Sequence, residues 1–276
     1  MTLAIGLALT PYESTMTQLN APSIFGANPV KSPARIGTDR LFYPVVGVLL
    51  LAITLYGFSD FYFHGRAFPN RPLTPPIRAL LIVHGIAQLS WLLLFIVQPA
   101  LVAGRNVRLH MRLGRAGAML ALALVVMGCF VGVGAARANP PELELFGMRP
   151  PQFLYVPLMT ISIFGVGVGL AVWQRRRPEI HRSLMLMATL AAMSAAMGRI
   201  SWLNDMFGDS AWFRVFGPVH SSVTLGLLLL IARSFFIRRF DKWLAISLAA
   251  MAAIFVVMYQ VSATGAWLGV ARFLMG

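Results

Sequence analysis

Four of the five histidines in this chain lie in or beside long apolar segments, where an ionisable side chain is costly and usually has a function. His84 and His220 each follow an arginine by six residues, which places both roughly 9 Å inside one boundary of their segments. His110 and His181 begin two other segments at the opposite boundary, roughly 20–25 Å away. Each six-coordinate b-type haem takes two neutral imidazoles from facing helices. Two pairs of matched depth, His84 with His220 and His110 with His181, therefore predict up to two haem b sites.

Each histidine also has a structural interpretation that the sequence leaves open. His110 and His181 stand among arginines, where an imidazole commonly contacts lipid headgroups or loop carbonyls. His84 and His220 can equally serve as hydrogen-bonding groups to a neighbouring helix. His64 lies in the aromatic sequence FYFHGR, and we expect it to anchor the chain at the membrane interface. A metal site built from the same histidines is a weaker alternative, because no mid-membrane carboxylate completes a ligand set.

The second apolar segment carries most of its polar groups on one helical face. His84, Trp91 and Gln98 recur at heptad spacing, and Gln88 lies one turn beyond His84. We expect this face to contact protein or water rather than lipid. In a protein without haem, it would line a path or a partner groove. Hydrogen bonding between helices explains Gln88 and Gln98 as well.

Arg199, near the end of the fifth apolar segment, could pair with a haem propionate or another anion. Snorkelling to headgroups or pairing with Asp205 would explain it equally. All nine carboxylates lie in tails, loops or segment ends, so none stands at mid-membrane depth. Many ion-coupled carriers need such a group, and acid–base catalysis needs a carboxylate pair or an equivalent motif. The sequence therefore disfavours both and leaves open whether the protein is an enzyme.

The composition places these residues in a membrane protein. The chain is 58% hydrophobic and only 12% charged, with a mean hydropathy of +0.74, well outside the range of soluble domains. Its formal net charge of +14 comes from arginines in short clusters between apolar segments. That distribution is typical of membrane topology and excludes a nucleic-acid partner. The single cysteine, Cys129, lies inside an apolar run and excludes disulfide and thiolate metal chemistry.

Seven apolar segments are each long enough to cross a bilayer, at about 20 residues per helix. The predicted fold is an all-α bundle of seven transmembrane helices in one domain, residues 41–276. Retinal chemistry is excluded, because the only lysines, Lys31 and Lys242, lie in basic flanks outside the last span. The predicted spans are 41–59, 77–99, 113–136, 152–173, 183–203, 213–232 and 243–264.

The basic residues also predict an orientation. Fifteen of the 23 lysines and arginines fall on the side of the N-terminus and eight on the other side, which predicts a cytoplasmic N-terminus and an external C-terminus. Residues 1–40 contain four prolines, and we expect a poorly ordered cytoplasmic tail. A misplaced start codon would explain that segment equally well.

Two of the histidines begin similar sequences, HMRLGRAGAMLALALVVMG from His110 and HRSLMLMATLAAMSAAMG from His181. This weak repeat suggests that the second and third spans and the fourth and fifth spans form related hairpins. Three motifs stand out over residues 41–240: His-Gly followed by Trp in the second span, LHxxLG before the third and RRPExHxxLM before the fifth. With these motifs the chain resembles an uncharacterised family of bacterial multi-span inner-membrane proteins.

The resemblance implies the bacterial inner membrane and marks the histidines without naming a reaction. The His-x-x-Leu openings are also similar, more distantly, to those of b-type cytochromes and of membrane proteins linked to oxidase assembly. We therefore predict a haem b-binding protein that transfers electrons in the lipid bilayer, with a redox partner or a larger membrane complex. The alternative is a non-redox membrane protein, either a small-molecule or lipid carrier or an assembly partner.

Overall fold

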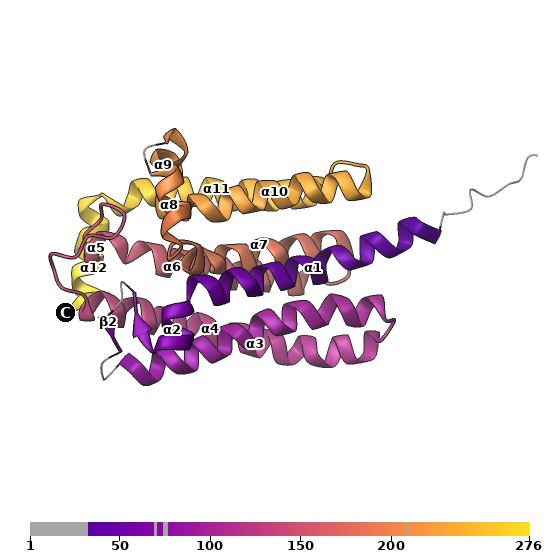
Figure 1. Ribbon diagram of the computed structural model, residues 1–276, viewed down its shortest axis with the longest axis horizontal. Helices are drawn as coiled ribbons and strands as arrows, with labels where there is room; N and C mark the ends of the chain where they lie inside the picture. The colour runs from indigo at the N-terminus through magenta and orange to yellow at the C-terminus, as the bar shows by residue number, and fades with distance from the viewer. Residues whose placement is uncertain (1–32, 69–70, 74–76, 209) are drawn as a thin grey trace, which may run out of the picture.

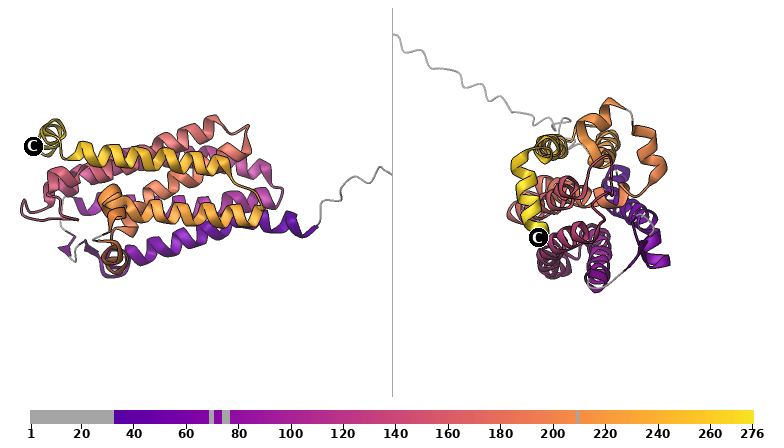
Figure 2. Two further views of the ribbon diagram at one scale, coloured as in Figure 1. Left: turned by 90° about the horizontal axis from the view of Figure 1, so that it is seen from above. Right: turned by 90° about the vertical axis from the view of Figure 1, so that its left-hand side faces the viewer.

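A computed structural model describes residues 33–68, 71–73, 77–208 and 210–276, with the side chains of 33–40 and Arg71 left aside. The described chain is an all-α bundle with one two-stranded hairpin, as Figure 1 shows. The long helices run side by side along the molecule (Figures 1 and 2). They are α1 (Pro33–Gly57), α3 (Ile77–Ala103), α4 (Val107–Ala138), α6 (Tyr155–Trp173), α7 (Pro178–Met197), α10 (His220–Ile237) and α11 (Lys242–Ser262).

Short elements gather at one end of this bundle. A strand pair, Arg66–Ala67 with Arg71–Pro72, makes a small antiparallel hairpin, β1 and β2. The helix α12 turns across the same end, as the right-hand view of Figure 2 shows, and Arg137 of α4 donates hydrogen bonds of 2.6 and 3.1 Å to the carbonyl of Leu274. We name this region the short-helix end. Its helices are α2 (Ser59–His64), α5 (Pro150–Phe153), α8 (Ser201–Phe207), α9 (Ala211–Phe216) with the 3₁₀ turn η1 (Gly217–Val219), and α12 (Gly265–Met275).

Six helical segments within the described residues are long and apolar enough to cross a membrane. The described apolar part of α1, Leu41–Gly57, is shorter than the other six, so the seventh span stays a prediction. Residues 33–40, expected in the tail, belong to α1, while residues 1–32 lie outside the described part. The six segments are Ile77–Ala103, Val107–Ala138, Pro150–Trp173, Pro178–Met197, Ala211–Ile237 and Lys242–Ser262.

Several helices begin or end away from their predicted boundaries for local reasons. The α4 helix begins at Val107, six residues before the predicted start, because the side chain of Asn106 caps it by accepting a hydrogen bond from the Leu109 amide. The α7 helix ends at Met197, short of the predicted residue 203. The predicted sixth span is interrupted at Gly217. Its φ of +56° is a positive value that glycine adopts readily and that does not occur in a right-handed helix.

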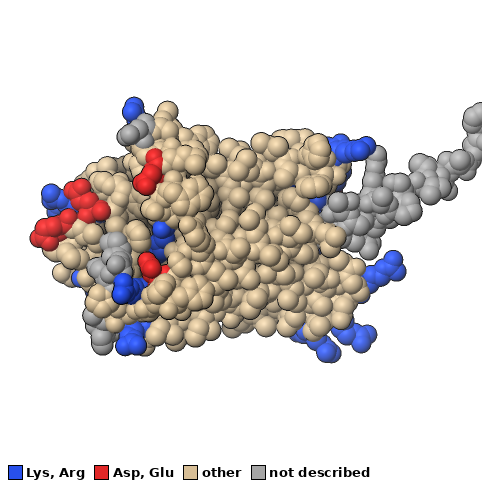
Figure 3. Space-filling view, viewed as in Figure 1, with Lys and Arg blue, Asp and Glu red and all other residues tan. Residues whose placement is uncertain are grey.

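The distribution of charged and apolar side chains on the surface of the bundle is the one expected for a membrane protein. Figure 3 shows charged side chains at both ends of the face in view and a broad uncharged belt between them. Large apolar side chains such as Val83, Leu122, Phe130 and Ile231 are exposed on the long helices, as they are on surfaces that contact lipid. The interior is filled by fully buried residues including Leu92, Phe164, Leu186 and Leu190. The helical bundle therefore fits a membrane protein in contact with a bilayer.

Helix adjacency determines which histidines can meet. The α6 helix packs against both α4 and α7, while α3 packs against α1 and α4. The α10 helix packs against α7, α11 and α1. Within the described part of the chain, α3 does not pack along the length of α10, and α4 does not pack along the length of α7.

Candidate functional site

Two of the predicted ligands, His110 and His181, lie together at the end of the bundle opposite the short helices. We name this region the basic end and define it by the loops 104–106, 174–177 and 238–241 with the helix turns beside them. His110 lies in the first turn of α4 and His181 in the first turn of α7. The two rings are close enough to interact electrostatically, because both helices pack on α6.

The ring of His181 is fixed by the end of α6. Its Nδ1 lies 2.8 Å from the carbonyl oxygen of Ala171. A carbonyl oxygen only accepts hydrogen bonds, so Nδ1 carries the proton and Nε2 keeps its lone pair in the neutral ring. This second contact orients the imidazole in the way that is usual for a metal-binding histidine.

The ring of His110 is held by Gln98, the last residue of the polar stripe on α3. The amide orientation that satisfies its surroundings has the nitrogen donating to the His110 carbonyl oxygen at 3.2 Å and to the ring Nδ1 at 2.5 Å. The amide oxygen then accepts from the Gly114 N–H at 2.9 Å. In this arrangement Nδ1 of His110 is an acceptor, so the neutral ring carries its proton on Nε2. The two histidines thus have opposite tautomers.

The remaining stripe residues link α3 to the core. Trp91 is buried, its Nε1 donates to Thr189 Oγ1 of α7 at 3.2 Å, and its ring meets Phe164 edge-on with centroids 4.9 Å apart. Gln88 is half-buried on the same helix. Trp91 and Gln98 therefore face protein, one towards α7 and the other towards α4.

The structure does not bring His84 and His220 together. His84 is half-buried on α3, and its Nδ1 has no hydrogen-bond partner among the described residues. His220 is fully buried at the start of α10, where Nδ1 lies 3.0 Å from the Gly217 carbonyl and Nε2 lies 2.9 Å from Ser221 Oγ. Both ring nitrogens are thus occupied locally, and α1 packs between α3 and α10. Equal depth in the sequence did not imply adjacent helices.

Arg199 lies at the short-helix end, far along the bundle from the His110–His181 pair. Its guanidinium stacks 4.3 Å from the ring centre of Phe58 and 5.4 Å from that of Phe68, and it donates to the carbonyl of Ala195. No carboxylate of the described residues, Asp205 included, forms an ion pair with it. It therefore cannot contact the propionates of a haem held at the basic end. His64, at the same end as Arg199, is exposed and lies 3.6 Å from Asp60.

The sequence interpretation did not single out one buried ion pair at the basic end. Arg233 of α10 has no exposed surface, and its Nε lies 3.5 Å from Asp241. Its guanidinium also lies 5.1 Å and 5.3 Å from the ring centres of Phe42 and Tyr43. The four residues after it, SFFI, continue the apolar helix. That run places Arg233 one turn inside the helix and could have distinguished it from the loop arginines.

No protein-family model, curated protein or solved structure matches this chain. Its own residues are therefore the basis on which a function is assigned.

Proposed function

We propose that this is a multi-pass inner-membrane protein that binds one haem b between His110 and His181 and transfers electrons through it. The observation that carries the proposal is the placement of these two imidazoles at the same end of the bundle, in the first turns of two helices that both pack on α6 and within electrostatic range of each other. By the distribution of arginines, this end faces the cytoplasm. A redox partner on that side would exchange electrons with the protein.

A single site replaces the two sites predicted from depth. An iron ligand needs a free nitrogen lone pair, and both nitrogens of His220 are engaged by Gly217 and Ser221. His84 has a free Nδ1 but lies on a helix that does not pack against α10. These contacts support one pair of ligands and not two.

His110 and His181 differ in how well their surroundings suit a haem ligand. His181 fits as it stands, because its Nδ1–H is bound to Ala171 and its Nε2 is left for iron. His110 fits less well, because an Nδ1–H would need the Gln98 amide turned over, which places the amide oxygen against the His110 carbonyl oxygen and the amide nitrogen against the Gly114 N–H. Bound haem would supply one-electron chemistry. The protein would orient the two rings, and Arg182, beside His181 in the chain, would offer a cation.

The Gln98 orientation also supports a second function. With opposite tautomers, neutral His110 carries its proton on Nε2, whereas neutral His181 keeps a lone pair there. Imidazoles oriented in this way serve as hydrogen-bonding groups and need no metal. In that case the protein is a non-redox membrane protein, either a carrier or an assembly partner, and the pair is a polar group within its basic end.

The experiment is a reduced-minus-oxidised visible spectrum of protein expressed with ample haem and purified in mild detergent. We expect sharp low-spin bands and about one haem per chain, from the bis-histidine ligation proposed above. His110→Ala and His181→Ala should abolish the bands. His84→Ala and His220→Ala are the matched controls and should retain them.

Each other outcome has a defined meaning. Two haems per chain would contradict the single site. A spectrum retained in His110→Ala and His181→Ala would refute the ligand assignment. A flat spectrum in the wild-type protein would reject the haem proposal and favour the non-redox membrane protein.

A further inference from the structure

A second candidate site lies at the short-helix end, around Arg199. The guanidinium lies between the rings of Phe58 and Phe68 and donates to the Ala195 carbonyl. Rings and a carbonyl offer partial negative charge only. Since no described carboxylate forms an ion pair with Arg199, its full charge is not balanced by a formal negative charge.

Arg199 lines a cleft of about 340 Å³ at the point where α1 and α7 end. A second guanidinium, Arg66, lines the same cleft, together with the hydroxyl-bearing residues Ser59 and Ser201. Asp60 is the one carboxylate in the lining. The aromatic side chains of the lining are Tyr56, Phe58, Phe61 and Phe68.

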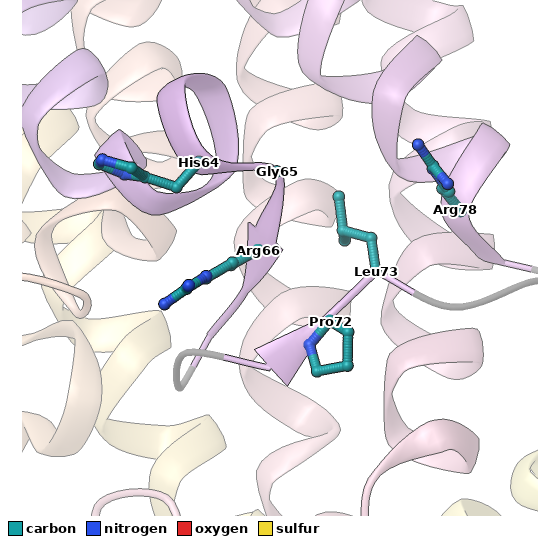
Figure 4. A pocket seen from close by; sticks show the side chains of 6 residues that line it. All are labelled: His64, Gly65, Arg66, Pro72, Leu73 and Arg78. Carbon is teal, nitrogen blue, oxygen red and sulfur yellow. The ribbon is translucent and has the colours of Figure 1, made fainter.

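A neighbouring cleft of about 580 Å³ adds further positive charge. It shares Arg66 with the first cleft and includes Arg78 and His64. Figure 4 shows the side chain of Arg66 turned away from Leu73 and Arg78. Among the described residues, the two clefts together are lined by three arginines and one carboxylate. This end of the molecule therefore attracts anions into an aromatic-lined hollow.

Arg199 is half-buried, so its cation loses part of its hydration. Burial lowers the pKa of Arg199 to about 10, because the charged form loses water, and the nearby Tyr62 opposes this shift. A buried cation is destabilising until an anion offsets the lost hydration. An anionic ligand in the cleft would supply that balance.

We propose that the cleft between Arg199 and Arg66 binds a phosphate group. Guanidinium groups recognise phosphate through paired hydrogen bonds, and hydroxyl groups add further donors. The cleft lies where two long helices end, which is the depth of lipid headgroups, and aromatic residues are typical of that depth. The phosphate can belong to a phospholipid headgroup or to a free phosphate compound. This inference is independent of the haem proposal, because it concerns the opposite end of the bundle.

The test measures ligand binding to delipidated full-length protein in mild detergent, by native mass spectrometry and thermal shift. Phosphatidylglycerol, diacylglycerol and inorganic phosphate are the three probes. We expect phosphatidylglycerol to bind and diacylglycerol, which lacks the phosphate, to bind at least about tenfold more weakly. Arg199→Gln and Arg66→Gln should each weaken phosphatidylglycerol binding by about tenfold or more. Arg272→Gln, which removes an exposed charge from α12 at the same end, should leave binding within about twofold.

Arg66→Gln keeps the Arg199 stack intact, so the proposal is tested even if Arg199→Gln fails to fold. Binding of inorganic phosphate equal to that of phosphatidylglycerol would identify a free phosphate compound as the ligand. The proposal would be overturned if all three variants bound phosphatidylglycerol equally well. It would also be overturned if the protein bound phosphatidylglycerol no better than diacylglycerol and did not bind inorganic phosphate.

Discussion

The basic end and the short-helix end of the bundle each contain an arginine that is withdrawn from solvent, fully in one case and partly in the other, and the surroundings of the two side chains differ. At the basic end, Arg233 is enclosed and lies against a carboxylate of its own chain, Asp241. At the short-helix end, Arg199 is half-buried against aromatic rings and a carbonyl oxygen, at the edge of a cleft. A cation balanced within the protein has a structural role, whereas one balanced only by partial charges leaves room for a ligand.

The histidines show a related contrast. His110 and His181 lie within electrostatic range of each other at the basic end, and the Nδ1 of each is hydrogen-bonded to a residue of another helix. Both ring nitrogens of His220 have hydrogen-bond partners within its own turn. The Nδ1 of His84 has no hydrogen-bond partner among the described residues. Of the two predicted pairs, only the first lies close enough for its rings to influence each other electrostatically.

The largest expected effect comes from breaking the buried pair at the basic end. Asp241→Asn should lower the free energy of unfolding by about 3–5 kcal/mol, because it leaves the charge of Arg233 buried without its carboxylate. Asparagine can still accept the Leu244 N–H that Asp241 caps, so helix capping is retained. Thermal unfolding in detergent measures the change. Asp205→Asn, an exposed position at the short-helix end, is the control, and an equal loss there would remove the contrast between the two ends.

A smaller effect tests the close packing beside the Arg199 cleft. Gly57 ends α1 against the backbone of α7, where an added Cβ would collide with the Ala196 carbonyl. Gly57→Ala should therefore destabilise the protein by about 1–3 kcal/mol. Gly169→Ala, with nothing near its Cβ, should be stabilising by about 0.5–1 kcal/mol in the helix interior. Unchanged melting temperature in Gly57→Ala would mean that α1 and α7 can separate at this end.

Tyr62 gives a pH-dependent prediction for the short-helix end. Burial raises the pKa of Tyr62 to about 12, and its hydroxyl donates to the Gly85 carbonyl at 3.2 Å. The unfolded chain loses this proton near its ordinary pKa of 10. The stabilising contribution is therefore complete below about pH 10 and is lost as the pH rises through about 12. A tyrosinate absorbance titration should show a component near pH 12 that Tyr62→Phe removes, and a titration unchanged by Tyr62→Phe would contradict this assignment.

The smallest expected effect is at the exposed ion pair of the basic end. Arg239 lies 3.0 Å from Glu179, and the two side chains are 65% and 50% exposed. Glu179→Gln should change the free energy of unfolding by less than about 0.5 kcal/mol, since solvent screens exposed pairs. The difference should disappear in high salt. A loss as large as that of Asp241→Asn would show that exposure does not separate the two pairs.

Much of the helical architecture could be predicted from the sequence because helix formation follows local composition. Six apolar segments matched helices long enough to cross a membrane, with errors at their ends. These differences in helix ends have local causes that are visible in the sequence, such as the Asn106 cap and the Gly217–Pro218 interruption. Arg233 was similarly placed with the loop arginines, although three of the four residues that follow it are apolar.

The sequence by itself determined the all-α class and six of the apolar segments, because both depend on residues close along the chain. The tertiary structure decided which helices are neighbours. Side-chain packing between distant segments joins α4 and α7 through α6 and keeps α3 from α10. It therefore selected the pair at the basic end, set the two tautomers through Ala171 and Gln98, and left Arg199 facing a cleft.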